Sequence, residues 1–256
     1  LFPISSSFSY PNISLNASFK PRSSKKFDFI KTTTAATKNL AITKVDAVGN
    51  LIWAKQIESV SGVTTISVDK DNNLLVAGVY LNTVDFDPGS SVFNLSAKNA
   101  GDIFLLKLDE NGGFLWAGSM GGKNGDFPYS ITTDLNNNIA LICQFNDTID
   151  VDMTATGVYN LIATTSMERA IVKLSPTGKF LWAHHLKDIN PNALDFDSSG
   201  NLYSTGYFLC IRDFDFGSGV FSMTTTGAPA SGDCYVLKED TSGKFLWAKS
   251  FGEFIN

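Results

Sequence analysis

The stretch Lys107-Leu-Asp-Glu-Asn-Gly-Gly-Phe-Leu-Trp-Ala117 decides the fold, because its pattern occurs four times at nearly constant spacing. The pattern K-x-[DS]-x-x-G-x-[FL]-[LI]-W-A stands at 44–54, 107–117, 173–183 and 238–248. It contains all the tryptophans of the chain, 63, 66 and 65 residues apart: Trp53, Trp116, Trp182 and Trp247. A fixed period of this size is typical of repeat proteins, whose units bury their faces against their neighbours.

Each copy predicts two strands joined by a tight turn. In the turn, an aspartate side chain accepts a hydrogen bond from a backbone N–H, and a glycine adopts the left-handed conformation in which a Cβ would clash. Asp109 and Gly112 fill these positions in the second copy, while Ser175 replaces the aspartate in the third. The tryptophans stand beside apolar residues, which favours a place in the core or between sheets over sugar stacking.

A second type of hairpin precedes three of the tryptophan hairpins. Its strands are predicted at 64–68 and 74–79, around the turn Asp69-Lys-Asp-Asn-Asn73, with counterparts around 134–138 and 195–201. The two hairpin types together give four strands per repeat of about 64 residues. The strand entering each tryptophan hairpin is apolar at nearly every position, as expected for a sheet covered on both faces.

These features predict an all-β fold, a β-propeller built from four-stranded repeats, because helix signals are nearly absent. The repeat domain is expected at 27–256, preceded by a serine-rich segment at 1–26 that forms either an arm or degenerate first strands. The chain has four tryptophan hairpins but only three complete hairpins of the second type. We therefore expect either a four-bladed ring, completed by residues 1–26, or part of a larger propeller.

The segments DIFLLKLDENGGFLWAGSMGG (102–122) and DFDPG (85–89) resemble the bacterial repeat of the seven-bladed β-propeller group, over residues 27–252. This family occurs in secreted and cell-surface proteins of diverse activity. The resemblance therefore implies the fold and a location outside the cell or on its outer surface, attached through another domain, but no particular activity. The chain departs from the family's seven blades by having four tryptophan hairpins.

Composition excludes some partners. The net charge is −5 and the lysines are scattered, so the basic stripe that nucleic-acid backbones require is missing. No apolar run reaches about 18 residues, so no transmembrane helix is expected. Sequence motifs for phosphate-binding loops, nucleophilic elbows and zinc proteases are also missing.

Three Asp-x-Asp pairs are the candidate metal ligands, with calcium as the candidate ion. Residues two apart on a strand point to one face, where two carboxylates attract a hard cation. The alternative is a solvated or turn-capping role, which the incomplete set of oxygen ligands favours. The pairs are Asp85 with Asp87, Asp150 with Asp152, and Asp213 with Asp215.

Paired carboxylates also fit a glycosidase or lyase, with Asp213 and Asp215 or Asp195 and Asp197 as the acidic pair. Their recurrence in each repeat argues against this, because a catalytic residue is needed only once. The two histidines, His184 and His185, are adjacent and so point to opposite faces of a strand; we expect them to be surface variation.

A disulfide is a candidate between Cys210 and Cys234, since the first ends one strand and the second opens the next antiparallel strand. Such a bridge would agree with an oxidising, extracellular environment, whereas Cys143 is left unpaired.

The leading hypothesis is a non-enzymatic, secreted or surface-attached propeller that binds a protein or glycan partner without a cofactor, apart from calcium. The least repeated segments, 119–127, 187–192 and 224–232, are the expected recognition loops. The alternatives are a carbohydrate-active enzyme and an architectural spacer in a larger surface assembly.

Overall fold

The computed structural model describes residues 38–98, 101–154, 156–226 and 232–252; the segment 1–26 lies outside them. Across these ranges the regular elements are all strands, which confirms the all-β prediction. The strands are β1 (Lys38–Val45), β2 (Leu51–Val68), β3 (Leu74–Tyr80), β4 (Thr83–Asp85), β5 (Asn94–Ser96), β6 (Asp102–Leu108), β7 (Phe114–Gly122), β8 (Phe127–Thr133), β9 (Ile139–Phe145), β10 (Thr148–Asp150), β11 (Asn160–Ile162), β12 (Glu168–Leu174), β13 (Phe180–Leu186), β14 (Ile189–Phe196), β15 (Leu202–Phe208), β16 (Ile211–Asp213), β17 (Ser222–Thr224), β18 (Asp233–Glu239) and β19 (Phe245–Phe251).

The four predicted tryptophan hairpins are present as β1–β2, β6–β7, β12–β13 and β18–β19. In each of them the lysine of the sequence pattern lies directly opposite the tryptophan, as in the pair Lys107 and Trp116. Asp109 holds the turn between β6 and β7, because its Oδ1 accepts the backbone N–H groups of Asn111 and Gly113 at 2.8 Å. The local pattern therefore sets the register of each hairpin.

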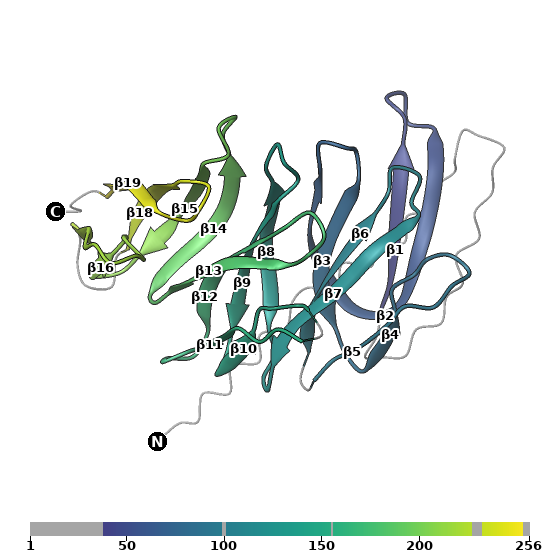
Figure 1. Ribbon diagram of the computed structural model, residues 1–256, viewed down its shortest axis with the longest axis horizontal. Coiled ribbons are helices and arrows are strands. Elements are labelled where there is room, and N and C mark those ends of the chain that lie inside the picture. Colours follow the sequence, from purple (N-terminus) through teal and green to yellow (C-terminus); the bar gives the residue numbers. More distant parts are fainter. Residues whose placement is uncertain (1–37, 99–100, 155, 227–231, 253–256) are drawn as a thin grey trace, which may run out of the picture.

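The sheets follow one another along the long axis of the structure (Figure 1). The second and third have the orders β8-β9-β12-β13 and β14-β15-β18-β19. The first is extended to seven strands, because the first half of β2 pairs with β1 and its second half with β3, and because β10 joins the end of β7. Strands β2, β8 and β14 lie against one another in series, which places the first strand of each unit along one line.

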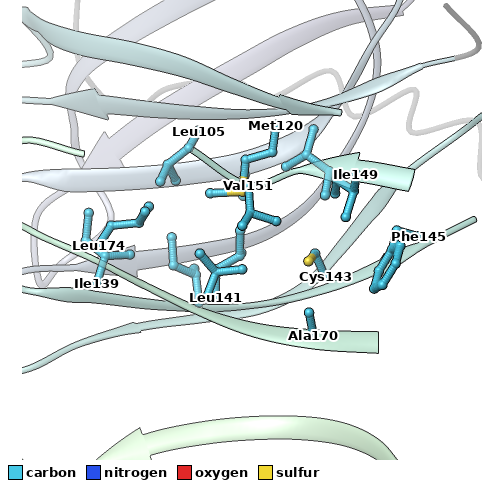
Figure 2. Close-up of a cluster of buried hydrophobic side chains, with 14 of the residues drawn as sticks. Leu105, Met120, Ile139, Leu141, Cys143, Phe145, Ile149, Val151, Ala170 and Leu174 are labelled. Carbon is cyan, nitrogen blue, oxygen red and sulfur yellow. The ribbon is translucent and has the colours of Figure 1, made fainter. Parts of the chain in front are cut away.

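Apolar side chains fill the spaces between successive sheets. In the space between the first two sheets, Leu105 and Met120 face Leu141 and Cys143 (Figure 2). Strands β6 and β12 are buried at every position, as the sequence predicted, whereas β18 is buried only at alternate positions. The reason is that β18 lies in the last described sheet, which has a neighbour on one face only.

The candidate recognition loops are short in the structure. Residues 119–122 belong to β7, β8 begins at Phe127, and β14 begins at Ile189. Of the third candidate loop, residues 227–231 lie outside the described residues. The segments 123–126 and 187–188 are thus brief connections between strands.

Candidate functional site

The first aspartate of each Asp-x-Asp pair holds a turn closed. Asp85 Oδ1 accepts the backbone N–H of Asp87 at 3.1 Å and that of Phe93 at 2.8 Å. The same two contacts recur at Asp150 and at Asp213. The carboxylate therefore ties the end of one short strand to the start of its partner.

The second aspartate of each pair caps the next bend. Asp87 Oδ1 accepts the N–H of Gly89 at 2.7 Å, and Asp215 Oδ1 that of Gly217 at 2.9 Å. Asp152 does the same with Thr154. Throughout the described ranges, no three His, Cys, Asp or Glu side chains gather as a ligand set for a metal ion. The geometry thus supports the turn-capping interpretation, and calcium binding stays a prediction.

A pocket of about 400 Å³ lies beside the first of these turns, where β2 passes from one hairpin to the next. The described residues that line it are mostly polar, three of them are acidic, and none of them is aromatic: Gln56, Ile57, Glu58, Ser59, Thr83, Val84, Asp85, Asp87 and Asn94. Ser59 has a left-handed backbone (φ 63°), which bends β2 at this point. The Oδ2 atoms of Asp85 and Asp87 make no hydrogen bond with the part of the chain that is described. This pocket is the candidate binding site.

The other candidate catalytic pair, Asp195 and Asp197, is divided between two roles. Asp197 Oδ1 caps the turn at Ser199 and Asn201, and its Oδ2 pairs with Lys238 at 3.0 Å. Asp195 lies exposed on β14, where its Oδ1 accepts the N–H of Phe196. One carboxylate of this pair, that of Asp197, therefore stabilises a turn.

The two histidines are partly buried and bound to glutamates, so the interpretation as surface variation is wrong. His184 Nε2 lies 3.1 Å from Glu239 Oε1 and 2.9 Å from the carbonyl of Gly243 in the next sheet. His185 instead contacts Glu168 on β12. His184 thus contacts the next sheet and His185 its own, which is consistent with the prediction that the two rings point to opposite faces of the strand.

The pKa values follow from these contacts. Burial alone would lower the pKa of His184, but Glu239 and the carbonyl of Gly243 raise it above its ordinary value. Burial raises the pKa of Glu239. For Glu168, burial is outweighed by hydrogen bonds from Thr164 and Thr165, which lower its pKa to about 2. Both pairs join strands or sheets, and neither lines the pocket.

Two more buried carboxyl groups, Asp102 and Asp126, were missed because nothing in the sequence marks them as buried. Their Oδ1 atoms are buried and have no hydrogen-bond partner among the described residues. Asp126 Oδ2 accepts the N–H of Gly122 at 3.0 Å. Burial raises the pKa of Asp102, and it raises the pKa of Asp126 to about 7, helped by the charge of Asp102.

The predicted disulfide is not formed in the structure, where Cys210, Cys234 and Cys143 are free thiols. The register explains the separation, because Cys234 lies opposite Tyr207 and not opposite Cys210. Cys210 falls beyond the end of β15, in a left-handed turn (φ 60°).

Three of the tryptophans pack against the core as predicted, and the fourth does not. Trp53, Trp116 and Trp182 each lie against a buried apolar cluster. Trp247 is 37% exposed, because its sheet is the last described one. In the described ranges no helix is long and apolar enough to cross a membrane, as expected.

No protein-family model matches the chain. An uncharacterised WD repeat-containing protein of Acanthamoeba polyphaga mimivirus is 27% identical over 238 residues, covering 80% of this chain and 17% of the viral protein. The chain thus spans less than a fifth of that relative's length. A crystal structure of a protein of unknown function from Bacteroides caccae covers 84% of this chain and 94% of its own, with 10% identity and a TM-score of 0.25. The viral relative and the all-β structure together support a β-propeller-like repeat fold.

Proposed function

We propose that the chain is a non-catalytic interaction module, part of a propeller of 64-residue repeats, which binds a protein partner at the pocket beside β2 and β4. WD repeats commonly form β-propellers with many short strands, and such rigid rings present loops and clefts to partners. A secreted or surface-attached location, as the family resemblance implies, is part of this proposal.

The observation that carries the proposal is the lining of the pocket. Glu58, Asp85 and Asp87 bring three carboxylates to one recess of about 400 Å³. A lysine or arginine side chain of a protein partner complements such a site, since charge-assisted hydrogen bonds to carboxylates are the strong ones. A glycan is the second candidate, but the described residues of this lining offer no aromatic face on which a sugar ring could stack.

Removing charge from the pocket tests the proposal. A peptide library containing lysine and arginine and a glycan array are screened against the 256-residue chain. We expect basic peptides to be enriched, and the double variant Glu58→Gln with Asp87→Asn to bind them at least about tenfold more weakly. Asparagine keeps the oxygen that accepts the N–H of Gly89, so the turn is preserved.

The matched control is Asp215→Asn, which changes the same capping contact in the third repeat but lies outside this pocket. It should leave binding unchanged. Enrichment of glycans alone would favour the glycan candidate, and peptide binding that ignores the double variant would contradict the proposed site. Titration with calcium chloride by calorimetry tests the calcium prediction at the three Asp-x-Asp turns.

Two alternatives predict different results in the same preparations. A carbohydrate-active enzyme would turn over a member of a glycan panel and lose that turnover in Asp215→Asn. An architectural spacer would bind neither library, while crosslinking in its native setting would find one fixed neighbour.

A further inference from the structure

Three positions that are apolar between the first and second sheets are polar between the second and third. Positions are equivalent where they have the same register to the pattern lysine and to the paired strand. The equivalent pairs, apolar residue first, are Ile103 and Arg169, Leu141 and Ser204, and Ala170 and Tyr235. A scaffold of repeats needs the same kind of side chain in each unit, so a polar set that departs from the repeat points to a site.

The three polar side chains are buried and incompletely bonded. Arg169, Ser204 and Tyr235 are 8%, 2% and 0% exposed. Arg169 Nε and the hydroxyl oxygens of Ser204 and Tyr235 have no hydrogen-bond partner in the part of the chain that is described. A buried polar group without a partner destabilises a fold, and native proteins contain few of them. Three such groups in one interface therefore indicate a further group to which they bind.

The strand register brings these groups together. Ser204 and Tyr235 are diagonal neighbours on the same face of β15 and β18. Pro191, Gly206 and Tyr235 lie side by side on β14, β15 and β18. Arg169 reaches this row from β12 of the second sheet, because its Nη1 donates to the carbonyl of Pro191. The guanidinium and the two hydroxyls thus meet across the interface of the two sheets.

The charge of Arg169 has no counter-charge in this interface. The guanidinium contacts the carbonyl of Pro191, the side-chain oxygen of Asn192 and the ring of Tyr129, whose centroid lies 3.9 Å from Cζ. None of these groups is an anion, and no carboxylate of the described residues forms an ion pair with Arg169. Since charges buried in proteins are normally paired, a positive charge remains to be neutralised here.

The other buried charged groups of the interface have partners of their own. Lys173 lies 3.6 Å from Asp134, and Glu239 lies 3.1 Å from His184. Glu239 is also four residues beyond Tyr235 on β18. These carboxylates are therefore committed to other cations.

The three unpartnered groups can all act as donors. The Nε–H of Arg169 only donates, and a serine or tyrosine hydroxyl can donate its hydrogen. Burial raises the pKa of Tyr235 and the charge of Glu239 adds to this, whereas Ser204 and Arg169 act against it. The phenol therefore keeps its proton and can donate it to an acceptor.

We propose that Arg169, Ser204 and Tyr235 bind a small monovalent anion, of the size of chloride, between the second and third sheets. The anion accepts hydrogen bonds from the Nε–H and the two hydroxyls, and it neutralises the guanidinium. A water molecule could accept the same hydrogen bonds, but it would leave the positive charge unpaired. This site is separate from the acidic pocket beside β2, and it does not depend on the proposed function.

Urea denaturation of the 256-residue chain tests the proposal, with sodium chloride replacing sodium gluconate at constant ionic strength. Gluconate is too large for a site between packed sheets, so only chloride should bind. A ligand that binds the folded state alone stabilises it by mass action. For a Kd of about 10 mM, we expect about 100 mM chloride to raise the folding equilibrium constant about tenfold.

The double variant Ser204→Val with Tyr235→Phe removes two donors and should lose this chloride dependence. Valine and phenylalanine fit these positions, because Val76 and Phe104 occupy them in the preceding unit. Tyr80→Phe is the matched control and should keep the full effect. It also removes a buried tyrosine hydroxyl, but one that is bonded to Ser119 Oγ at 2.8 Å. Comparing the variants cancels the general effects of the two salts.

Crystals grown in sodium bromide locate the anion, because bromide scatters anomalously. We expect an anomalous peak within hydrogen-bond distance of Arg169 Nε and the two hydroxyls. The proposal would be overturned by a stability that does not depend on chloride, by a double variant that keeps the dependence, or by an ordered water molecule in place of the bromide peak.

Discussion

Replacing Lys107 by methionine is expected to lower the free energy of unfolding by about 3–5 kcal/mol, because it leaves a buried carboxylate without its counter-charge. Lys107 Nζ lies 2.8 Å from Asp69 Oδ2, and the two side chains are 5% and 0% exposed. Burial would raise the pKa of Asp69, but Lys107 and Asn73 hold it below its ordinary value. Without the ammonium group, Asp69 keeps its place in the turn and loses its counter-charge.

Chemical denaturation monitored by tryptophan fluorescence measures this loss. Adding Asp69→Asn should recover part of the stability, because asparagine is neutral and still offers an oxygen to the turn N–H groups. Lys238→Met is the matched control: its partner Asp197 is 28% exposed, so solvent screens the pair and its loss should change stability little. Equal losses at Lys107 and Lys238 would contradict the role of burial.

Asp126→Asn is expected to make stability less dependent on pH. Burial raises the pKa of Asp126 from 3.8 to about 7, so the folded chain holds a proton that the unfolded chain releases. The stabilisation that comes from the protonated Asp126 is fully present below its ordinary pKa of 3.8 and is lost as the pH rises through the folded pKa of about 7. At about 1.4 kcal/mol per pH unit, the fall approaches about 4 kcal/mol.

Urea denaturation of both proteins at about pH 4 and about pH 8 isolates the contribution of Asp126, since asparagine does not titrate in this range. The variant should be close to the unaltered chain at the lower pH and more stable at the higher one. Asp147→Asn, an exposed position, is the control and should leave the profile unchanged. A constant difference between Asp126→Asn and the unaltered chain at both pH values would show that Asp126 does not titrate with folding.

Much of the fold was predictable because it depends on residues two to four positions apart. The turn aspartates bond backbone groups within four residues, so pattern and register appear together in the sequence. The same holds for the capping role of the Asp-x-Asp pairs. The prediction of a disulfide between Cys210 and Cys234 was wrong, because it rested on the order of the strands along the chain. The strand register places Cys234 opposite Tyr207 instead.

The sequence by itself determined an all-β chain of tryptophan hairpins and the turns that close them, since these follow from local hydrogen bonding and the alternation of strands. Only the tertiary structure decided which polar groups are buried, because burial depends on the sheet that stacks above. Lys107 and His184 look solvated in the sequence, yet each is buried against an ionic partner from another part of the chain, Asp69 and Glu239. The pocket also arises from the tertiary structure, where β2 passes from one hairpin to the next and lies beside the turn of Asp85 and Asp87.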